Sequence, residues 1–218
     1  MLAVWLAVAL MLAPRVAAAD PALDDVIGRI EDRYAKLEDL KAAFQQTSFN
    51  KSLNQTIPAD GTVYLKKGGK MRWEYRAPSP QQIVSDGRSI WIYTPELNQV
   101  NVGEAPKVLA GPAGSFLAGL GKLRTYFTVR FLNAAQKVNA EGHYVLDLRP
   151  RKPEPTLARL VIEVDPREWL VRGAEMYDQF DNTVRMRFTK IAANGGLPDR
   201  LFAFVPPKGA ATVPMDAR

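Results

Sequence analysis

The chain has 218 residues, no Cys and one His, and 29 Lys and Arg against 23 Asp and Glu give it a net charge of +6 at pH 7. The lack of Cys excludes disulfides, thiol catalysis and Cys-based metal sites. The length suits one domain with a sizeable core.

The N-terminus predicts a secretory signal peptide. Residues 1–12 are an apolar run, and the small residues at 17–19 are typical of a cleavage site before Asp20. The run is shorter than the roughly 20 residues that cross a bilayer. No Lys or Arg precedes it, so an uncleaved amphipathic or buried helix is the alternative. We expect residues 1–19 to be removed and residues 20–218 to form a single domain.

Apolar residues at three- and four-residue spacing predict an amphipathic helix from Asp20 to about Gln45. Asp24 and Asp25 lie in its first turn, where they complement the helix dipole. A strand is expected to begin near its end, at Phe44. The apolar stripe of the helix consists of Leu23, Val26, Ile27, Ile30, Tyr34, Leu37 and Phe44.

After this helix the pattern changes to period two, which is typical of strands. Gly68-Gly69 and Asp86-Gly87 predict hairpin turns. An Ala-, Gly- and Leu-rich segment at 106–126 interrupts the alternation and predicts one or two short helices. The predicted strands are 44–49, 62–67, 70–76, 82–85, 89–93, 99–102, 128–133, 143–149, 157–165, 170–178, 182–190 and 201–205.

These elements predict a mainly β fold with helices, in which about 11 strands form an unclosed antiparallel half-barrel. A sheet of this size curls and so has a concave face. The N-terminal helix and the mid-chain helical insertion are both apolar enough to cover that face, so we expect them to act as its lid.

The sequence offers little reactive chemistry. His143 has no second His and no clustered carboxylate pair nearby in sequence. Neither a nucleophile elbow nor a phosphate-binding loop is present. We therefore expect a binding protein and no enzyme, with no metal, no cofactor and no nucleic-acid partner. Clusters of Lys and Arg either favour anionic surfaces or are simply solvated.

The strand at 70–76 has two distinct faces. Met71, Trp73 and Tyr75 share one face, and the charged residues between them share the other. Ordinary core packing is one interpretation of the apolar face, and the wall of an apolar cavity is the other. Met adapts to irregular apolar partners, so the cavity competes with ordinary core packing as an interpretation.

The strand at 89–93 also alternates, but its inward face is open to two interpretations. Either Trp91 and Tyr93 or Ile90 and Ile92 form the inward pair. The residues predicted to line the cavity or its lid are Val63, Leu65, Met71, Trp73, Tyr75, Trp91, Tyr93, Phe116, Leu117 and Leu120.

The segment at 65–100, LKKGGKMRWEYRAPSPQQIVSDGRSIWIYTPELNQV, resembles the core signature of the outer-membrane lipoprotein carriers, the LolA family. The run V-S-D-G-x-x-x-W-x-Y-x-P at 84–95, the closing FAFVPPKG at 202–209 and the N-terminal helix support the resemblance. It covers nearly all of the chain after residue 19.

The resemblance implies a periplasmic carrier whose cavity receives lipoprotein acyl chains. It also implies an inner-membrane lipoprotein-releasing ABC transporter as the donor and an outer-membrane acceptor as the recipient. We expect a monomer. A lipid- or lipoprotein-sensing regulatory module of the same fold is the alternative function, and a hydrolase of lipid-linked substrates is a third.

One position departs from the family pattern. In the family, an Arg followed by Pro ends the strand before the 70–76 strand and hydrogen-bonds to the lid; here Lys67 and Gly68 stand in those places. Lys lacks the bidentate fork of Arg. Either Lys67 holds the lid more weakly, or another group such as Arg72 holds it.

Overall fold

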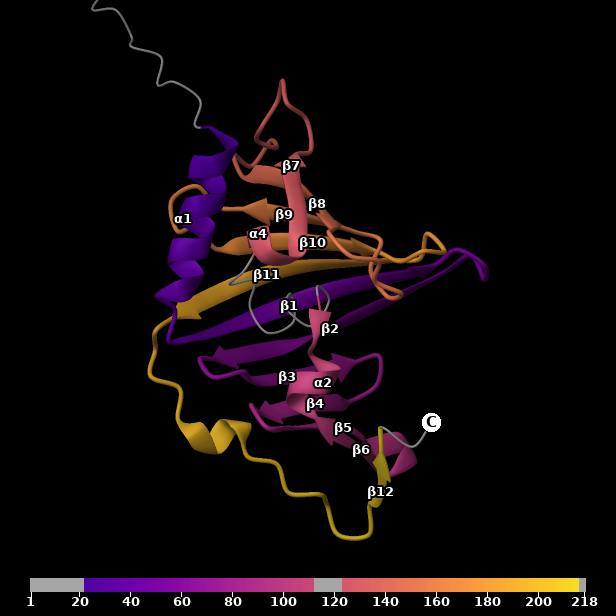
Figure 1. The fold of residues 1–218 in the computed structure, drawn as a ribbon. Coiled ribbons are helices and arrows are strands. Elements are labelled where there is room, and N and C mark those ends of the chain that lie inside the picture. The colour runs from indigo at the N-terminus through magenta and orange to yellow at the C-terminus, as the bar shows by residue number, and fades with distance from the viewer. Residues whose placement is uncertain (1–21, 112–122, 216–218) are drawn as a thin grey trace, which may run out of the picture.

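The computed structural model describes residues 22–111 and 123–215 (Figure 1). The predicted lid residues Phe116, Leu117 and Leu120 lie outside these ranges. Within the described ranges, no helix has the length and apolar character that crossing a membrane requires.

The elements in chain order are α1 (Leu23–Ala35), β1 (Asp39–Asn50), β2 (Gln55–Lys66), β3 (Lys70–Ala77), β4 (Gln81–Asp86), β5 (Ser89–Thr94), η1 (Pro95–Leu97), β6 (Gln99–Glu104), α2 (Ala105–Val108), α4 (Leu123–Tyr126), β7 (Phe127–Phe131), β8 (Tyr144–Pro150), β9 (Arg159–Val164), β10 (Val171–Tyr177), β11 (Thr183–Ala193), η2 (Asp199–Phe202) and β12 (Ala211–Pro214).

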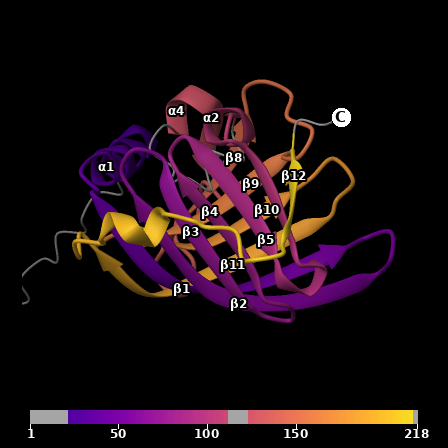
Figure 2. The same cartoon turned by 90° about the horizontal axis from the view of Figure 1, so that it is seen from below.

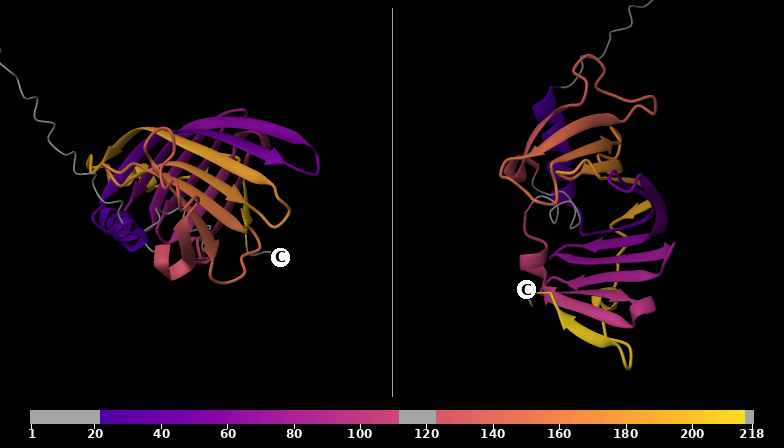
Figure 3. Two further views of the ribbon diagram at one scale, coloured as in Figure 1. Left: turned by 90° about the horizontal axis from the view of Figure 1, so that it is seen from above. Right: turned by 90° about the vertical axis from the view of Figure 1, so that its right-hand side faces the viewer.

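The described strands form one sheet of 12 strands in the order β12-β6-β5-β4-β3-β2-β1-β11-β10-β9-β8-β7. The sheet does not close, because β12 and β7 are its two edges. Of these described strands only β12 pairs in parallel, with β6. Figures 2 and 3 show the sheet curling, with α1, α2 and α4 all on its concave side. The predicted fold class, a mainly β unclosed half-barrel, is confirmed.

The first helix is shorter than predicted, because α1 ends at Ala35 and not near Gln45. From Leu40 onward the buried residues alternate, with Leu40, Ala42 and Phe44 all turned to the core. This stretch pairs with β2 on one side and β11 on the other. A central strand satisfies its backbone on both sides while burying one face, and these tertiary gains outweigh the helical spacing.

The predicted strand at 201–205 is wrong. Residues 199–202 form the 3₁₀-helix η2, and the last strand is β12 further along the chain. Pro206 and Pro207 have no N–H to donate, so the chain there is poorly suited to a ladder. The short β12 shows no apolar alternation, which is why the pattern does not reveal it.

The core lies between the concave face and the helices. Val26, Ile27 and Ile30 of α1 are buried in one cluster with the inward residues of the sheet. Leu123 of α4 joins the same cluster. Burying a side chain of this kind stabilises the fold by about 1.5–3 kcal/mol, so the covering elements are held mainly by apolar contact.

Candidate functional site

The concave face of β2 and β3 is apolar throughout its centre. Val63 pairs in register with Trp73, and Leu65 pairs with Met71. Val63, Met71 and Trp73 are only 2%, 1% and 3% exposed, and Leu65 and Tyr75 are partly buried against the same cluster. The structure thus places these five predicted residues together on one surface, beneath the helices.

Four aromatic side chains, Phe44, Trp73, Tyr75 and Phe188, form what we call the aromatic floor. The ring centroid of Phe44 lies 5.2 Å from that of Trp73 and 5.0 Å from that of Tyr75, both edge-on. Phe188 of β11 meets Trp73 edge-on at 6.4 Å. Such edge-to-face pairs add about 0.5–1.5 kcal/mol beyond area burial, so the floor is a well-ordered surface.

Sequence reasoning does not find Phe44 and Phe188 as members of this floor. The helical spacing places Phe44 in the stripe of the first helix, although its alternation with Leu40 and Ala42 is the signal for a strand. Phe188 lies within a predicted strand, but no sequence spacing shows that β11 pairs with β1, the strand that carries Phe44.

Two polar groups on this face are satisfied by nearby partners. The Tyr75 hydroxyl donates to Gln46 Oε1 at 3.1 Å, and burial raises the pKa of Tyr75 to about 12. Ser85 Oγ donates to the carbonyl of Gly69 and accepts from the N–H of Gly87, each at 3.1 Å. A phenol with that pKa stays neutral near pH 7, so the face carries no charge at Tyr75.

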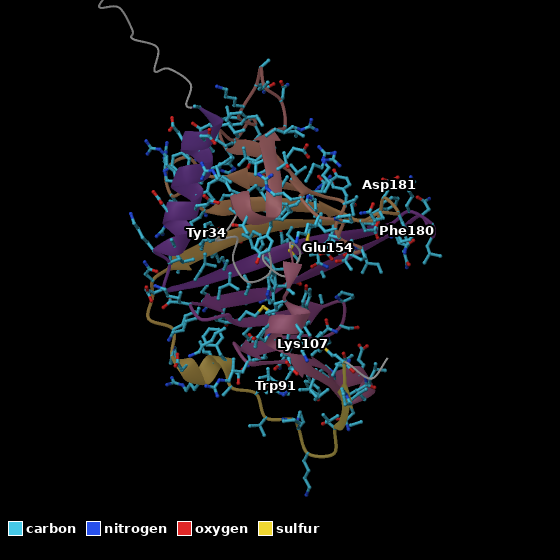
Figure 4. The ribbon with its side chains drawn as sticks, viewed as in Figure 1. Tyr34, Trp91, Lys107, Glu154, Phe180 and Asp181 are labelled. Carbon is cyan, nitrogen blue, oxygen red and sulfur yellow. The ribbon has the colours of Figure 1, made fainter. Side chains whose placement is uncertain are left out.

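Trp91 and Tyr93 lie on the opposite, outer face of the sheet. Their ring centroids are 5.9 and 6.2 Å from that of Phe204 in the C-terminal segment. Ile90, which alternates with them, is buried in the concave cluster instead. Figure 4 labels Trp91 on β5, at the end of the molecule where η2 also lies. The inward assignment of Trp91 and Tyr93 is therefore corrected, since Ile90 has that place.

Arg72 also faces outward, as its alternation with Met71 and Trp73 predicts. It donates to Glu74 Oε1 at 2.6 Å, to Gln82 Oε1 at 3.0 Å and to the carbonyl of Leu201 at 3.3 Å. Arg72 thus fastens the C-terminal segment to the outer face, on the side away from α1. This corrects its assignment as a lid contact.

The same C-terminal segment is held by a charge cluster. Lys66 and Lys70 donate to the two carboxylate oxygens of Asp199 at 2.6 and 2.8 Å. These two hydrogen bonds lower the pKa of Asp199 to about 2. The segment therefore stays anchored at every pH at which this carboxylate is ionised.

Lys67 contacts the connection between α1 and β1. Its Nζ donates to Glu38 Oε1 at 2.8 Å, and its backbone N–H donates to the Glu38 carbonyl at 2.9 Å. Both side chains are exposed. An exposed pair of this kind contributes about 0–1 kcal/mol, so it is a weak tie between the end of β2 and the connection that follows α1.

Two further features of the described residues, a cluster of potential metal ligands and a groove, do not match the predicted site. Glu141, His143 and Glu163 bring potential metal-ligand atoms within 4.8 Å of one another, but Arg187 already lies 3.2 Å from both oxygens of Glu141. A groove of about 710 Å³ adjoins the aromatic floor at Phe44. Its other lining consists of small residues and of the polar side chains Gln45, Gln46, Thr47, Asp60, Arg76, Thr189 and Lys190. That lining is poorly suited to an apolar ligand.

Known proteins match this chain over most of its length. The family model described as "Outer membrane lipoprotein carrier protein LolA" matches residues 35–205. An outer-membrane lipoprotein carrier protein of Dechloromonas aromatica (strain RCB) is 32% identical over 187 residues, which are 86% of each chain. One of Legionella pneumophila (strain Corby) is 31% identical over 185 residues, 84% of this chain and 87% of that one.

The fold is also similar to solved structures. An uncharacterized conserved protein from Thermus thermophilus matches with a TM-score of 0.56 and 14% identity, over 88% of this chain and 98% of that one. At that identity the likeness concerns the fold alone.

Proposed function

We propose that this chain, which belongs to the family of outer membrane lipoprotein carrier proteins, LolA, carries lipoprotein acyl chains through the periplasm from the inner to the outer membrane. The observation that carries the proposal is the uncharged concave face of β2 and β3, with Val63, Met71 and Trp73 beneath the helical cover. We propose Val63, Leu65, Met71, Trp73 and Tyr75 as its acyl-chain contacts.

The physical need for such a carrier is large. Each CH₂ group removed from water is worth about 0.8 kcal/mol, so a lipid anchor with several acyl chains costs on the order of tens of kcal/mol to expose. The cargo must also leave again. A cover held mainly by apolar contacts and exposed ion pairs, such as Lys67 with Glu38, suits reversible opening.

The structure alters the residue set of the proposal at β5. Ile90 replaces Trp91 and Tyr93 as the inward residue of that strand. Phe116, Leu117 and Leu120 stay predictions for the lid. The donor and the acceptor, an inner-membrane lipoprotein-releasing ABC transporter and an outer-membrane receptor, are proposed from the family alone, as is transfer by a monomer.

Met71→Glu tests the proposal, because it puts a charge on the concave face. Lipoproteins should co-purify from the periplasm with the unaltered protein and not with this variant. Thr128→Glu is the matched control: it adds the same charge at an exposed position of β7, opposite Arg149. Since a buried charge endangers folding, Met71→Ala serves as a milder second variant, and circular dichroism checks each fold.

The outcomes separate carriage from its alternatives. If the unaltered protein never holds lipoproteins and Met71→Glu sorts them normally, the carrier proposal fails. Stable binding to a signalling membrane protein without transfer of cargo supports the regulatory module instead. Turnover of a lipid substrate supports a hydrolase.

A further inference from the structure

The indole nitrogen of Trp73 is an unpartnered donor in the middle of the concave face. Trp73 Nε1 is buried and has no hydrogen-bond partner among the described residues. The whole side chain is 3% exposed. An N–H group withdrawn from water without an acceptor is costly, so native structures rarely leave one unmatched.

The other buried polar groups in this part of the sheet are matched. The Tyr75 hydroxyl donates to Gln46, and the Ser85 hydroxyl both donates and accepts a hydrogen bond. Asp39 accepts three backbone N–H groups from Gly195, Gly196 and Leu197 at 2.8–2.9 Å. Trp73 Nε1 is thus an exception among the described buried polar groups around β1 to β4.

Among the described residues, the register partners and ring neighbours of Trp73 carry no conventional side-chain acceptor. Its register partners are Val63 on β2 and Ile83 on β4. Its ring neighbours are Phe44 and Phe188, which meet it edge-on. An aromatic ring face is the best acceptor these neighbours provide, and such N–H···π contacts are weak.

We infer that Trp73 Nε1–H is kept free for the cargo, and that it donates a hydrogen bond to a carbonyl oxygen where a fatty acyl chain joins its ester or amide. The inference rests on the proposed function and adds a polar specificity element to a surface that otherwise recognises only apolar bulk. The carbonyl oxygen of an ester or amide is a good acceptor for this donor, whereas the corresponding alkyl ether lacks the carbonyl and offers only the weaker ether oxygen. A site built around one hydrogen bond discriminates in this way against ligands that lack the partner.

The first test compares 1,2-dioctanoylglycerol, an ester, with 1,2-dioctylglycerol, its ether analogue. Indole N–H signals of the ¹⁵N-labelled protein are recorded with each probe, and the Trp73 signal is assigned by its loss in Trp73→Phe. The ester should move the Trp73 proton signal downfield, as a new hydrogen bond does. The ether fills nearly the same space but lacks the carbonyl, so it should move the signal much less.

The second test measures dissociation constants by calorimetry. Trp73→Phe removes the N–H and keeps an apolar ring, so it should weaken ester binding about three- to tenfold and ether binding much less. Trp91→Phe is the matched control, because it removes an indole from the outer face and should change neither affinity. If Trp73→Phe fails to fold, single Phe variants of the other three Trp assign the Trp73 signal by elimination, and the spectra of the unaltered protein decide the matter.

Three outcomes are distinguishable. A clearly larger downfield shift with the ester than with the ether, together with a selective loss of ester affinity in Trp73→Phe, supports the hydrogen bond to the carbonyl. Equal binding of both probes with the same Trp73 signal overturns it, assigns the N–H to a ring face, and leaves the carrier proposal standing. If the unaltered protein binds neither probe, both proposals fall.

Discussion

The ring of Phe44 occupies the space that a side chain on Gly61 would need. The two residues are partners in the β1–β2 register, and a Cβ on Gly61 would lie 2.7 Å from Cζ of Phe44. The same Cβ would collide with the carbonyl oxygen of Glu74. The edge-on contacts of Phe44 with Trp73 and Tyr75 therefore depend on the absence of a side chain one strand away.

Gly61→Ala should destabilise the protein by about 1–3 kcal/mol, because the added methyl overpacks a filled site. Urea denaturation measures the change. Gly28→Ala is the control: a Cβ there meets nothing within 4 Å, and Gly28 lies inside α1. Replacing a helical Gly should add about 0.5–1 kcal/mol of stability. Equal effects of the two substitutions would contradict the steric account.

Asp147 should confer stability that depends on pH. Its side chain is 0% exposed, and burial opposes its ionisation. Hydrogen bonds from Arg159 at 2.5 Å and Arg130 at 2.7 Å outweigh burial and hold its pKa below the usual value. The folded state thus binds this proton less tightly than the unfolded state, so the stabilisation is complete above about pH 4 and is lost as pH falls through the lowered pKa.

Asp147→Asn should therefore cost about 2 kcal/mol near pH 7. The cost should shrink as the pH drops below about 4, because the unfolded state of the unaltered protein then takes up the proton more readily than the folded state. Parallel urea titrations of the two proteins from about pH 7 to about pH 3 measure the difference. If the difference between the two free energies of unfolding stays constant with pH, the ionised carboxylate of Asp147 is not the cause of the stabilisation.

Phe204→Ala should loosen the C-terminal segment without weakening cargo binding. Phe204 contacts Trp91 and Tyr93 on the outer face, opposite the proposed site. Removing a partly buried Phe should cost about 1–2 kcal/mol, and amide exchange between residues 199 and 210 should quicken. Phe44→Ala, on the concave face, should weaken binding of the ester probe. A loss of binding in Phe204→Ala would refute the assignment of faces.

Lys67→Ala tests how much the Lys67–Glu38 pair contributes. Because both side chains are exposed, the free energy of unfolding should change by less than about 1 kcal/mol. Lys67→Arg should also have little effect, since Glu38 already accepts the backbone N–H of residue 67. Thermal denaturation and ester-probe binding measure both variants. A large drop in either would mean that Lys67 holds the helical cover more firmly than one exposed ion pair allows.

Local pattern predicts most of the sheet, because strands and tight turns leave short-range signals. The alternation of Met71, Trp73 and Tyr75 and the turn at Gly68-Gly69 lie within one hairpin, and both are confirmed. The predicted end of α1 is wrong because Phe44 satisfies a helical and a strand spacing at once. Pairing of β1 with β2 and β11 makes Phe44 a strand residue. Local pattern does not reveal this pairing, because β11 is far along the chain.

The sidedness of β5 depends on the C-terminal segment. Trp91 and Tyr93 are large and apolar, which favours an inward position for any isolated strand. Phe204 covers them from a part of the chain more than a hundred residues away, so both faces of this strand are apolar. Period-two alternation identifies the faces of a strand, but it does not tell which of two covered faces is concave.

The open topology also bears on how much the interior can hold. In a closed barrel, hydrogen bonds between every neighbouring pair of strands fix the diameter. Here β7 and β12 stand at opposite ends of the order and share no ladder. The sheet can therefore coil more tightly or more loosely without losing a backbone hydrogen bond between strands, and we expect the proposed carrier to fit acyl chains of different bulk.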